Sequence, residues 1–540
     1  MTERAPGGRA ATSPGDARAY HEATKHSRAS VRSDRHTLDW ANKPFLFKVY
    51  PEVPTVPLPR EVQPPTLPTL EAVARGTVPE GRGVVDAATL AQLLFFSAGL
   101  TKRKVYPGGE TIHFRAAAST GALYQTEVYV VAGAVTGLEP GVYHFCPGDF
   151  TLRRLRPGDH RAALAEATAR GNLVADAPAT VILTAIHWRN TWKYRARAFR
   201  HFFWDAGTLL ANLLATAAAS DVPARILLGF ADPLVNALLG LDAAREGSLA
   251  LVALGRGTGP APVSPPAPPL WLSSVPLSPR EEDYPLVRAA YEASTLPDAA
   301  AARAWLARGE ERTSSPAPPV PAEARPTASP GGPAREPSRA LGETILRRGS
   351  TREFQRDPIT GAQLRAILGA GLRPPPLDLE RADALVETYL LVHAVEGFAS
   401  GAYVWDPLAR APRLLKPGEF RREGGELCLE QPLGADASVV AFFLSDLDAV
   451  LTRWGSRGYR AVNLAAGLLG GQLYLGAYGL GLGATGLTFY DDDVVRFFEP
   501  DAAGKDAIFV TALGPAARRQ SPGDLQLAPA TVEPLHPGQA

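Results

Sequence analysis

Two arginines that bracket a hydroxyl group stand in the stretch LRRGSTREF, residues 346–354. The guanidinium groups of Arg348 and Arg352 can each make paired contacts with phosphate oxygens, and the hydroxyl of Ser350 can add a hydrogen bond. The spacing therefore fits a ligand that carries a phosphate. Taken alone, two exposed arginines on a solvated surface are the commoner explanation, and the motif by itself does not separate the two interpretations.

A lysine followed by a tyrosine, Lys193 and Tyr194, is the second candidate for chemistry. The chain has only eight lysines, and Lys193 is the only one between Lys104 and Lys416. Its amine can lose a proton, which an arginine effectively cannot do. Neighbouring arginines would favour the neutral amine and lower its pKa toward the range of a general base. These arginines are Arg189, Arg195, Arg197 and Arg200. The alternative is a lysine that lies by chance on a solvated helix face.

The composition restricts the classes of partner. The 540 residues include 56 lysines and arginines against 55 aspartates and glutamates, a net charge of +1, so we expect neither nucleic acid nor a polybasic membrane contact. The two cysteines cannot form a disulfide framework, and no segment resembling a signal peptide opens the chain, which favours the cytoplasm. The scattered histidines, among them His187 and His201, lack the spacing of metal ligands, so we expect no metal.

The stretch 461–490 contains no charged residue and is long enough to span a bilayer. Its many glycines, together with Asn463 and Gln472, instead favour a buried helix at an interface, followed by a glycine-rich turn. We therefore expect no membrane span.

The sequence repeats itself when it is shifted by 260 residues. One block of matches has the alternating pattern of strands joined by turns, and a second block has a long helix rich in small residues, a turn and another helix. The first block matches Glu127, Tyr129, Gly141 and Tyr143 with Glu387, Tyr389, Gly401 and Tyr403. The second matches Arg197, Arg200, Gly207 and Asp232 with Arg457, Arg460, Gly467 and Asp492. The chain is therefore expected to contain two homologous α+β domains.

The repeat and the proline-rich stretches place the domain boundaries. We expect a loose N-terminal segment over 1–35, a first domain over 36–258, a proline-rich linker with short helices over 259–340, a second domain over 341–522 and a C-terminal tail over 523–540. Small residues at matched positions of the two long helices, such as Gly207 and Gly467, would allow close helix contact. The two domains are expected to form an internal pseudo-dimer, like the two-fold interface of a homodimer.

Several motifs together resemble the flavin-dependent nitroreductase family. Arg348, Ser350 and Arg352 are similar to the family's Arg-x-Ser-x-Arg motif, and the stretch 481–486 is similar to its late glycine turn. The stretch 115–124 resembles the family's Pro-Ser-x-Gly-x-x-(Tyr/His)-Pro loop. Two departures from that loop are Ala118 and Gln125, which stand in place of its prolines.

A narrower resemblance is carried by Lys193 and Tyr194, by the TKHS stretch at 24–27 and by the stretch 38–51. These resemble the tandem-domain members of the SagB/ThcOx-type peptide dehydrogenases. The resemblance implies an α+β fold of two nitroreductase-like domains in tandem, each with a mixed, mostly antiparallel sheet flanked by helices, which form an internal pseudo-dimer.

In the nitroreductase fold each FMN lies at the dimer interface and is held by both subunits. Here each half keeps what the other lacks. The loop 119–124 falls on 379–384, which does not resemble it, and the region upstream of the first half's helix, around 76–80, holds no pair like Arg348 and Arg352. The resemblance therefore implies one composite FMN site and a vacant second one. The residues that it implies are Ser119, Thr120, Gly121, Ala122 and Leu123 from the first half and Arg348, Ser350, Arg352, Gly483, Ala484, Thr485, Gly486 and Arg518 from the second. For Arg518, a solvated basic tail is the alternative.

The narrower resemblance implies an FMN-dependent dehydrogenase that oxidises an azoline to an azole, a thiazole or oxazole, in a ribosomal precursor peptide during natural-product biosynthesis. Lys193, assisted by Tyr194, would remove a ring proton while hydride passes to the flavin, and oxygen would reoxidise the flavin. A cyclodehydratase is the implied partner, and the chain would be a monomer or a higher homo-oligomer. Two alternatives stay open: an NAD(P)H-dependent nitro or quinone reductase, and a pseudoenzyme that binds a peptide or a partner without flavin.

Overall fold

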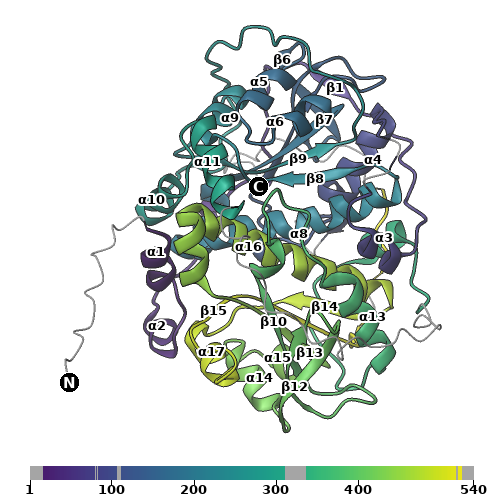
Figure 1. Cartoon of the computed structure of the whole chain (residues 1–540), viewed down its shortest axis with the longest axis vertical. Helices are drawn as coiled ribbons and strands as arrows, with labels where there is room; N and C mark the ends of the chain where they lie inside the picture. Colours follow the sequence, from purple (N-terminus) through teal and green to yellow (C-terminus); the bar gives the residue numbers. More distant parts are fainter. Residues whose placement is uncertain are drawn as a thin grey trace.

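The computed structural model describes residues 16–78, 81, 83–105, 111–310, 336–518 and 521–525. The sheet of the first half lies in an upper unit and the sheet of the second half in a lower unit (Figure 1). The long helices α8 (Ala198–Ala219) and α16 (Leu447–Gly479) lie side by side between the two units. The first half also contains α1 (Ala17–Ala23), α2 (Arg28–Ser33), η1 (Trp40–Asn42), β1 (Thr55–Pro57), α3 (Thr69–Arg75), α4 (Ala87–Ala98), β2 (Leu100–Val105), β3 (Thr111–Arg115), η2 (Thr120–Ala122), β4 (Thr126–Ala132), β5 (Gly141–Cys146), β6 (Thr151–Pro157), α5 (Arg161–Glu166), α6 (Gly171–Asp176), β7 (Ala179–Ile186), α7 (His187–Tyr194), η3 (Arg195–Arg197), β8 (Ala224–Leu227), α9 (Asp232–Leu239) and β9 (Glu246–Leu254).

The second half begins with two helices that precede its sheet. Its elements besides α16 are α10 (Pro285–Ala293), α11 (Ala299–Glu310), α12 (Leu341–Arg347), α13 (Gly361–Gly371), η5 (Ala382–Ala384), β10 (Glu387–Val392), β11 (Gly401–Asp406), β12 (Ala411–Pro417), α14 (Arg421–Leu427), α15 (Pro432–Asp436), β13 (Val439–Ser445), β14 (Gly483–Gly486), α17 (Asp491–Phe498) and β15 (Asp506–Gly514).

Each half is built around one sheet. The strand order is β1-β6-β5-β4-β7-β9-β8 in the first half and β12-β11-β10-β13-β15-β14 in the second, so the second sheet repeats the first without β1. The ladders between these described strands are antiparallel. The central strands β7 and β13 are buried along their whole length, which explains why apolar residues predominate in their sequences. The predicted pair of tandem α+β domains is confirmed.

The contact between α8 and α16 depends on glycines. A Cβ atom on Gly207 would overlap the backbone of Leu468, and a Cβ atom on Gly467 would overlap the backbone of Trp204. A larger residue at either glycine would therefore force the two helix axes apart. The small residues that the sequence predicted at the internal interface do lie there.

Two buried arginines, Arg197 at the end of η3 and Arg200 in α8, bind an aspartate from the other half. Arg200 donates to the carboxylate of Asp491 at 2.7 Å and Arg197 donates to it at 3.1 Å, and all three side chains are buried. Helix α1 covers this cluster, because Arg200 also donates to the carbonyl oxygen of His21 at 2.7 Å and to the hydroxyl of Thr24 at 3.0 Å. A helix of the first half thus encloses an ion pair that joins the two halves.

The second half carries the reciprocal cluster. Arg460 of α16 donates to the carboxylate of Asp232 at 2.7 Å, and Arg457 donates to it at 2.8 Å. Helix α10 covers this cluster as α1 covers the first, since Arg460 also donates to the carbonyl oxygen of Tyr291 at 2.8 Å and to the hydroxyl of Ser294 at 2.7 Å. Helix α10 is therefore the counterpart of α1, and the duplication begins at these two helices.

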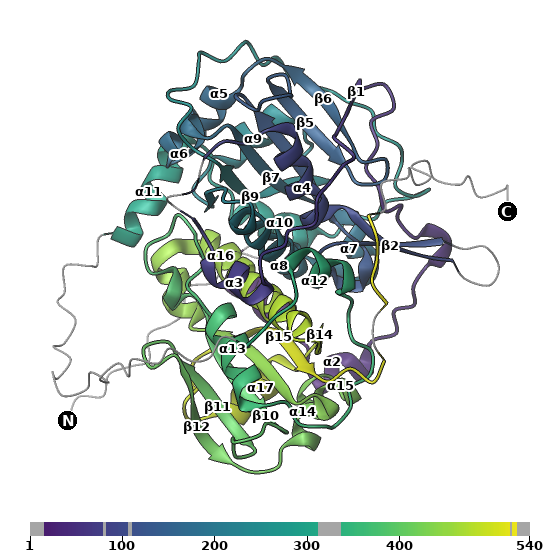
Figure 2. The same cartoon turned by 90° about the vertical axis from the view of Figure 1, so that its right-hand side faces the viewer.

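Two boundaries expected from the sequence need correction. Residues 17–33 are not loose: Tyr20 and His21 are fully buried, and α2 lies against the lower unit (Figure 2), where Arg28 pairs with Asp493 at 3.2 Å. Residues 1–15 lie outside the described part of the chain. The expected linker over 259–340 includes α10 and α11, which belong to the packed structure because they cover buried groups of the interface.

The matching of one aspartate was also wrong. The shift of 260 residues pairs Asp232 with Asp492, whereas Asp491 is the residue that binds the arginines. The connection before β14 is one residue shorter than the connection before β8. A comparison without gaps at a shift of 260 residues is therefore out of register by one residue after this connection, which is why it matches Asp232 with Asp492.

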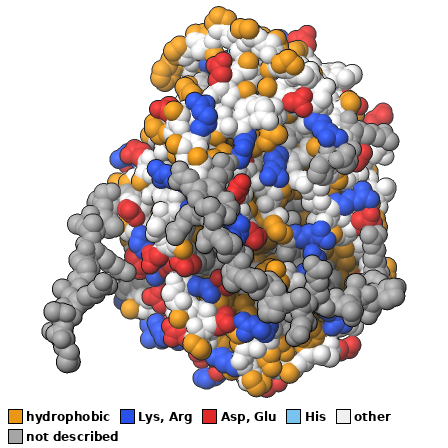
Figure 3. All heavy atoms as spheres, in the orientation of Figure 1, with side chains coloured by type: hydrophobic (Ala, Val, Ile, Leu, Met, Phe, Trp, Pro, Cys, Tyr) orange, Lys and Arg blue, Asp and Glu red, His pale blue; other side chains and the backbone are white. Residues whose placement is uncertain are grey.

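The charge-free stretch 461–490 runs through α16, a turn and β14, and most of it is buried. Within the described part of the chain, one helical stretch, His187–Ala219, is long and apolar enough to cross a membrane, and 94% of its apolar window is buried inside the protein. This is the environment of a core helix. On the outside of the molecule, acidic and basic side chains are interspersed over the face seen in Figure 3.

Asp491→Ala should destabilise the protein strongly, because it leaves two buried guanidinium groups without their carboxylate. Breaking a buried ion pair from one side costs about 3–5 kcal/mol, and we expect a loss of that size in the free energy of unfolding, measured in urea by circular dichroism. Asp492→Ala is the matched control: its side chain is 60% exposed and pairs with Lys25, and such pairs contribute about 0–1 kcal/mol. Equal losses in the two variants would contradict the role of Asp491.

Candidate functional site

The Arg-Ser-Arg motif at 348–352 follows α12 and lies against the first half of the chain. Arg348 is buried and donates to the carbonyl oxygens of Ala116 at 2.7 Å and Arg115 at 3.0 Å. Arg115 ends β3, and the chain then leads into the loop 119–124. The structure therefore brings the motif of one half next to the loop of the other.

The stretch 481–486, predicted as a glycine turn, begins as a turn at Gly481, whose φ is +80°. It continues as strand β14, which pairs with β15. The first residue of β14 must be small, because a Cβ atom on Gly483 would overlap the hydroxyl of Thr351. The backbone N–H of Thr351 also donates to the carbonyl oxygen of Ala484 at 2.9 Å. Strand β14 and the Arg-Ser-Arg motif are thus held together by close backbone contact.

Two tyrosines of α16 complete this contact. The hydroxyl of Tyr474 accepts the backbone N–H of Gly486 and bonds Ser350, and burial raises the pKa of this tyrosine. The hydroxyl of Tyr478 bonds that of Thr351 at 3.2 Å. Sequence reasoning missed both tyrosines. The available signal was two phenolic rings four residues apart in the charge-free stretch 461–490, which is rich in small and apolar residues.

Asp205 of α8 organises the loop of the first half. Its carboxylate accepts hydrogen bonds from the hydroxyl of Ser119 at 2.7 Å, from the N–H and hydroxyl of Thr120 at 2.8 and 2.6 Å and from the amide of Gln125 at 2.8 Å. Burial raises the pKa of Asp205, and these hydrogen bonds oppose the rise. Ala118 and Gln125 stand where the resembled loop has prolines, so this network supplies the rigidity that the prolines would give.

Lys193 and Tyr194 end α7 beside this loop. A Cβ atom on Gly121, whose φ is +63°, would lie 2.9 Å from the hydroxyl oxygen of Tyr194 and 3.4 Å from Cδ of Lys193. The next residue, Arg195, has a φ of +48°, a region that favours glycine. This strained residue makes the kink between α7 and α8, and the kink holds the lysine–tyrosine pair against the loop.

The pKa of Lys193 lies below its usual value, as expected, but the neighbouring arginines are not the cause. Burial is the largest cause, and the positive charges of Arg352 and Lys43 follow. The arginines expected to act on it are each paired with a carboxylate. Arg189 pairs with Glu127, Arg195 with Asp34, and Arg197 and Arg200 with Asp491. Burial and the charge of Asp205 raise the pKa of Tyr194, so its hydroxyl stays protonated.

The donor set at the motif fits a phosphate. Among the residues that the structure describes, neither Arg348 nor Arg352 pairs with a carboxylate, whereas the four buried arginines of the internal interface all do. Two cations without an anionic partner and the hydroxyl of Ser350 therefore lie together at 348–352. This set suits the phosphate of a cofactor such as FMN.

Arg518 lies at the edge of this region. Its side chain is 89% exposed, and its guanidinium is 4.0 Å from the carboxylate of Glu353, which follows the motif. The structure therefore places Arg518 near the motif but outside the buried contacts that form the site. Over the described ranges, no group of three histidine, cysteine, aspartate or glutamate side chains could hold a metal ion.

In the second half, Arg453 and Trp454 take the positions of Lys193 and Tyr194. The backbone turns at the next residue in both halves, with a φ of +58° at Gly455. The titratable pair therefore occurs once, although the backbone that carries it occurs twice.

Helix α11 fills the space over this counterpart pair. The indole N–H of Trp305 donates to the carbonyl oxygen of Trp454 at 2.8 Å, and Arg453 donates to the carbonyl oxygen of Gly309. Leu306 of the same helix is buried, and it lies against Gly229 just beyond β8. The position equivalent to the candidate site is thus occupied by the protein's own chain.

The fold and this composite site define a two-domain nitroreductase-type oxidoreductase. Residues 82–256 and 345–500 match the model of the nitroreductase family, and the chain belongs to this family. A solved structure from Anabaena variabilis ATCC 29413 is 28% identical, with a TM-score of 0.69, over 92% of this chain and 99% of its own. A curated protein of Methanocaldococcus jannaschii is 28% identical over 167 residues, 31% of this chain and 79% of its own length. Both are named "putative nitroreductase".

Lys193 should titrate below the ordinary lysine value of 10.5. With eight lysines in the chain, NMR of ¹³C-methylated amines can follow each one, and Lys193→Arg assigns the signal. Lys43→Gln removes a nearby positive charge and should raise the midpoint of Lys193 by roughly 0.3–1 pH unit. Arg422→Gln, which changes an arginine that is 79% exposed on α14, is the control and should not move it.

A midpoint for Lys193 at or above 10.5 would contradict the burial and charge argument. The signal of Lys193 must be distinguished from that of Lys102 on β2. The pKa of Lys102 is also low, about 8, because the side chain is buried and lies near the charges of Arg348 and Arg347.

Proposed function

We propose that the protein is an FMN-dependent oxidoreductase with one cofactor site per chain, built from both halves. The observation that carries this proposal is the contact of Arg348 with the carbonyl groups of Arg115 and Ala116, because it joins a phosphate donor set to the loop 119–124. Residues 348–352 and strand β14, Gly483–Gly486, would hold the phosphate, and Ser119–Leu123 would contact the ring. The filling of the counterpart position by α11 supports a single site.

We further propose the SagB/ThcOx-type reaction, dehydrogenation of an azoline ring to an azole in a ribosomal peptide. The ring gives up one hydride and one proton. FMN, when bound, supplies the acceptor for the hydride. The neutral Nζ of Lys193 takes the ring proton, and burial with the charges of Arg352 and Lys43 keeps this amine available as a base. The protonated hydroxyl of Tyr194 orients the substrate as a hydrogen-bond donor.

The purified protein should contain about one FMN per polypeptide, measured from the flavin released on unfolding. Arg348→Gln should weaken FMN binding by roughly 10- to 100-fold, since charge-assisted hydrogen bonds contribute about 1.5–3 kcal/mol each, and Arg422→Gln should leave it unchanged. Two FMN per chain would contradict the filling of the counterpart site. No FMN after reconstitution would favour a protein that binds a peptide without flavin.

Lys193→Ala should abolish oxidation of an azoline-containing peptide while FMN stays bound, with kcat lower by roughly 10²- to 10⁴-fold. Lys193→Arg should be equally damaging, because arginine cannot give up its proton at working pH. Mass spectrometry of the peptide detects the loss of two hydrogens, and Lys104→Ala, an exposed lysine of β2, is the control.

Loss of FMN from the Lys193→Ala protein would instead make the lysine structural. An NAD(P)H-dependent nitro or quinone reductase is the second candidate, which the family match supports. Rapid reduction of the flavin by a nicotinamide, without oxidation of azoline peptides by the wild-type protein, would favour that candidate.

A further inference from the structure

Trp40 is a large aromatic residue that the fold leaves exposed. Its side chain is 66% exposed, although the segment around it is firmly held. The indole N–H of Trp192 donates to the carbonyl oxygen of Asp39 at 3.0 Å, and the backbone N–H of Arg280 donates to the side chain of the buried Asn42 at 3.1 Å. A rigid, exposed indole offers a large contact area at little cost in conformational entropy, which is typical of a recognition residue.

Trp40 lies beside the candidate base. Its ring packs edge-on against that of Trp192, with centroids 5.4 Å apart, and Trp192 directly precedes Lys193. The Nζ of Lys43 lies 5.7 Å from the centre of the Trp40 ring. The positive charge of Lys43 helps to lower the pKa of Lys193. We call Trp40 and Lys43 the Trp40 edge. It borders the site on the side of the base.

The internal symmetry shows what occupies the equivalent place in the other half. Helix α10 is the counterpart of α1. After α1 the chain forms the short helix α2 and then the segment with the Trp40 edge, whereas after α10 it forms the longer helix α11. Helix α11 lies over Arg453 and Trp454, the counterparts of Lys193 and Tyr194. The counterpart site is thus covered by α11. At the candidate site, the segment with the Trp40 edge lies beside the half-buried Lys193 and does not form such a covering helix.

We propose that the Trp40 edge binds the residues that flank the reacting ring of a peptide substrate, in the place that α11 takes at the counterpart site. This inference rests on the proposed peptide oxidation. The indole of Trp40 would pack against the peptide chain, and Lys43 would attract a carboxylate. Lys193 must be neutral to act as the base, but Lys43 and Arg352 carry positive charge on this side of the site. The substrate class is therefore a peptide with an acidic residue next to the ring.

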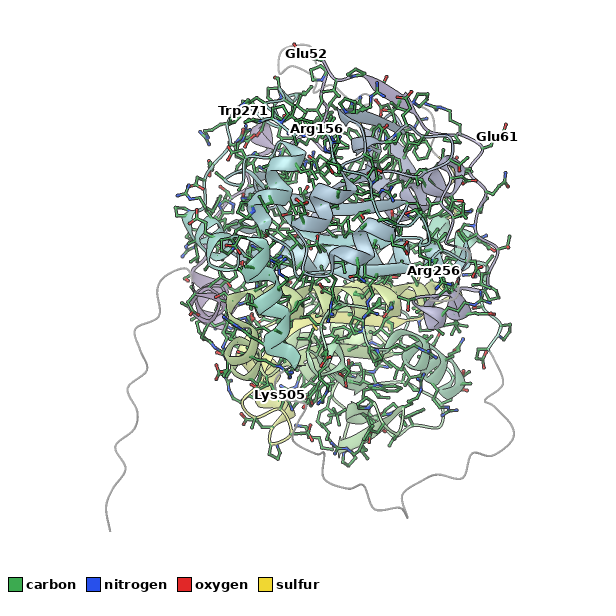
Figure 4. All side chains as sticks on the ribbon, turned by 45° about the horizontal axis from the view of Figure 1, so that its top comes forward. Glu52, Glu61, Arg156, Arg256, Trp271 and Lys505 are labelled. Atoms are coloured by element: carbon green, nitrogen blue, oxygen red, sulfur yellow. The ribbon has the colours of Figure 1, made fainter. Side chains whose placement is uncertain are left out.

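The test compares two substrates on the FMN-loaded protein: an azoline-containing peptide and a small free azoline without flanking residues. We compare kcat/KM for the peptide with kcat/KM for the small substrate. Trp40→Ala should lower this ratio by about tenfold, mainly because the KM of the peptide rises. Trp40→Phe should recover most of the ratio. Trp271→Ala is the matched control, because Trp271 is 89% exposed and lies on the outer surface of the upper unit (Figure 4).

Lys43→Gln tests the charge. It should raise the KM of a peptide with an acidic residue beside the ring about fivefold more than the KM of a peptide with glutamine at that position, measured at low salt. An effect of Lys43 that acts through Lys193 would change both peptides alike and cancels in this comparison. The difference between the two peptides should shrink at high salt, because exposed charges are screened.

An unchanged substrate ratio in Trp40→Ala, or a fall of the same size in Trp271→Ala, would overturn the inference. If the wild-type protein oxidises neither substrate, the proposed reaction fails. The inference is then decided by the affinity of the oxidised azole peptide for the FMN-loaded protein: a loss of about tenfold in Trp40→Ala, with none in Trp271→Ala, supports it, and equal affinities reject it.

Discussion

The structure depends on two buried arginine–aspartate clusters, each of which takes its cations from one half and its anion from the other. Arg200 with Asp491 and Arg460 with Asp232 are buried charges, and neither guanidinium could be left unpaired in the interior without a large cost. The clusters are reciprocal, so the two halves can satisfy both only in the pseudo-two-fold arrangement. Close contact of α8 with α16 at their glycines adds the apolar part of the same interface.

The same interface brings together the two parts of the candidate site, one from each half. Arg348 reaches the backbone of Arg115 and Ala116 across it, and Asp205, on the interface helix α8, fixes the loop that follows. A homodimer would have to keep both sites equal, because each subunit has the same sequence. A fused pair is free of that restriction, and here one site retains its donors while α11 closes the other.

Much of this could be predicted from the sequence, because the repeat spacing and the motifs are local features. The tandem domains and the helix contact follow from matched residues, and the proximity of motif and loop follows from the resemblance to the nitroreductase family. What could not be predicted depends on contacts between distant segments. The position of α1 depends on its contacts with Arg200. Asp491 rather than Asp492 binds the arginines because the connection before β14 is one residue shorter than its counterpart. Tyr474 can hold β14 only because the strand passes beside α16.

The pair at 193 and 194 shows how the same backbone can carry different functions. Arg453 is fixed by a carbonyl oxygen of α11, and its guanidinium would stay charged in any case. Lys193 is half-buried near Arg352 and Lys43, which disfavour its charged form. The kink that holds the pair requires a positive φ, which Gly455 adopts without strain, whereas Arg195 adopts it at a cost. Strain is therefore kept in the half that also keeps the titratable amine, and it is absent from the half that α11 has closed.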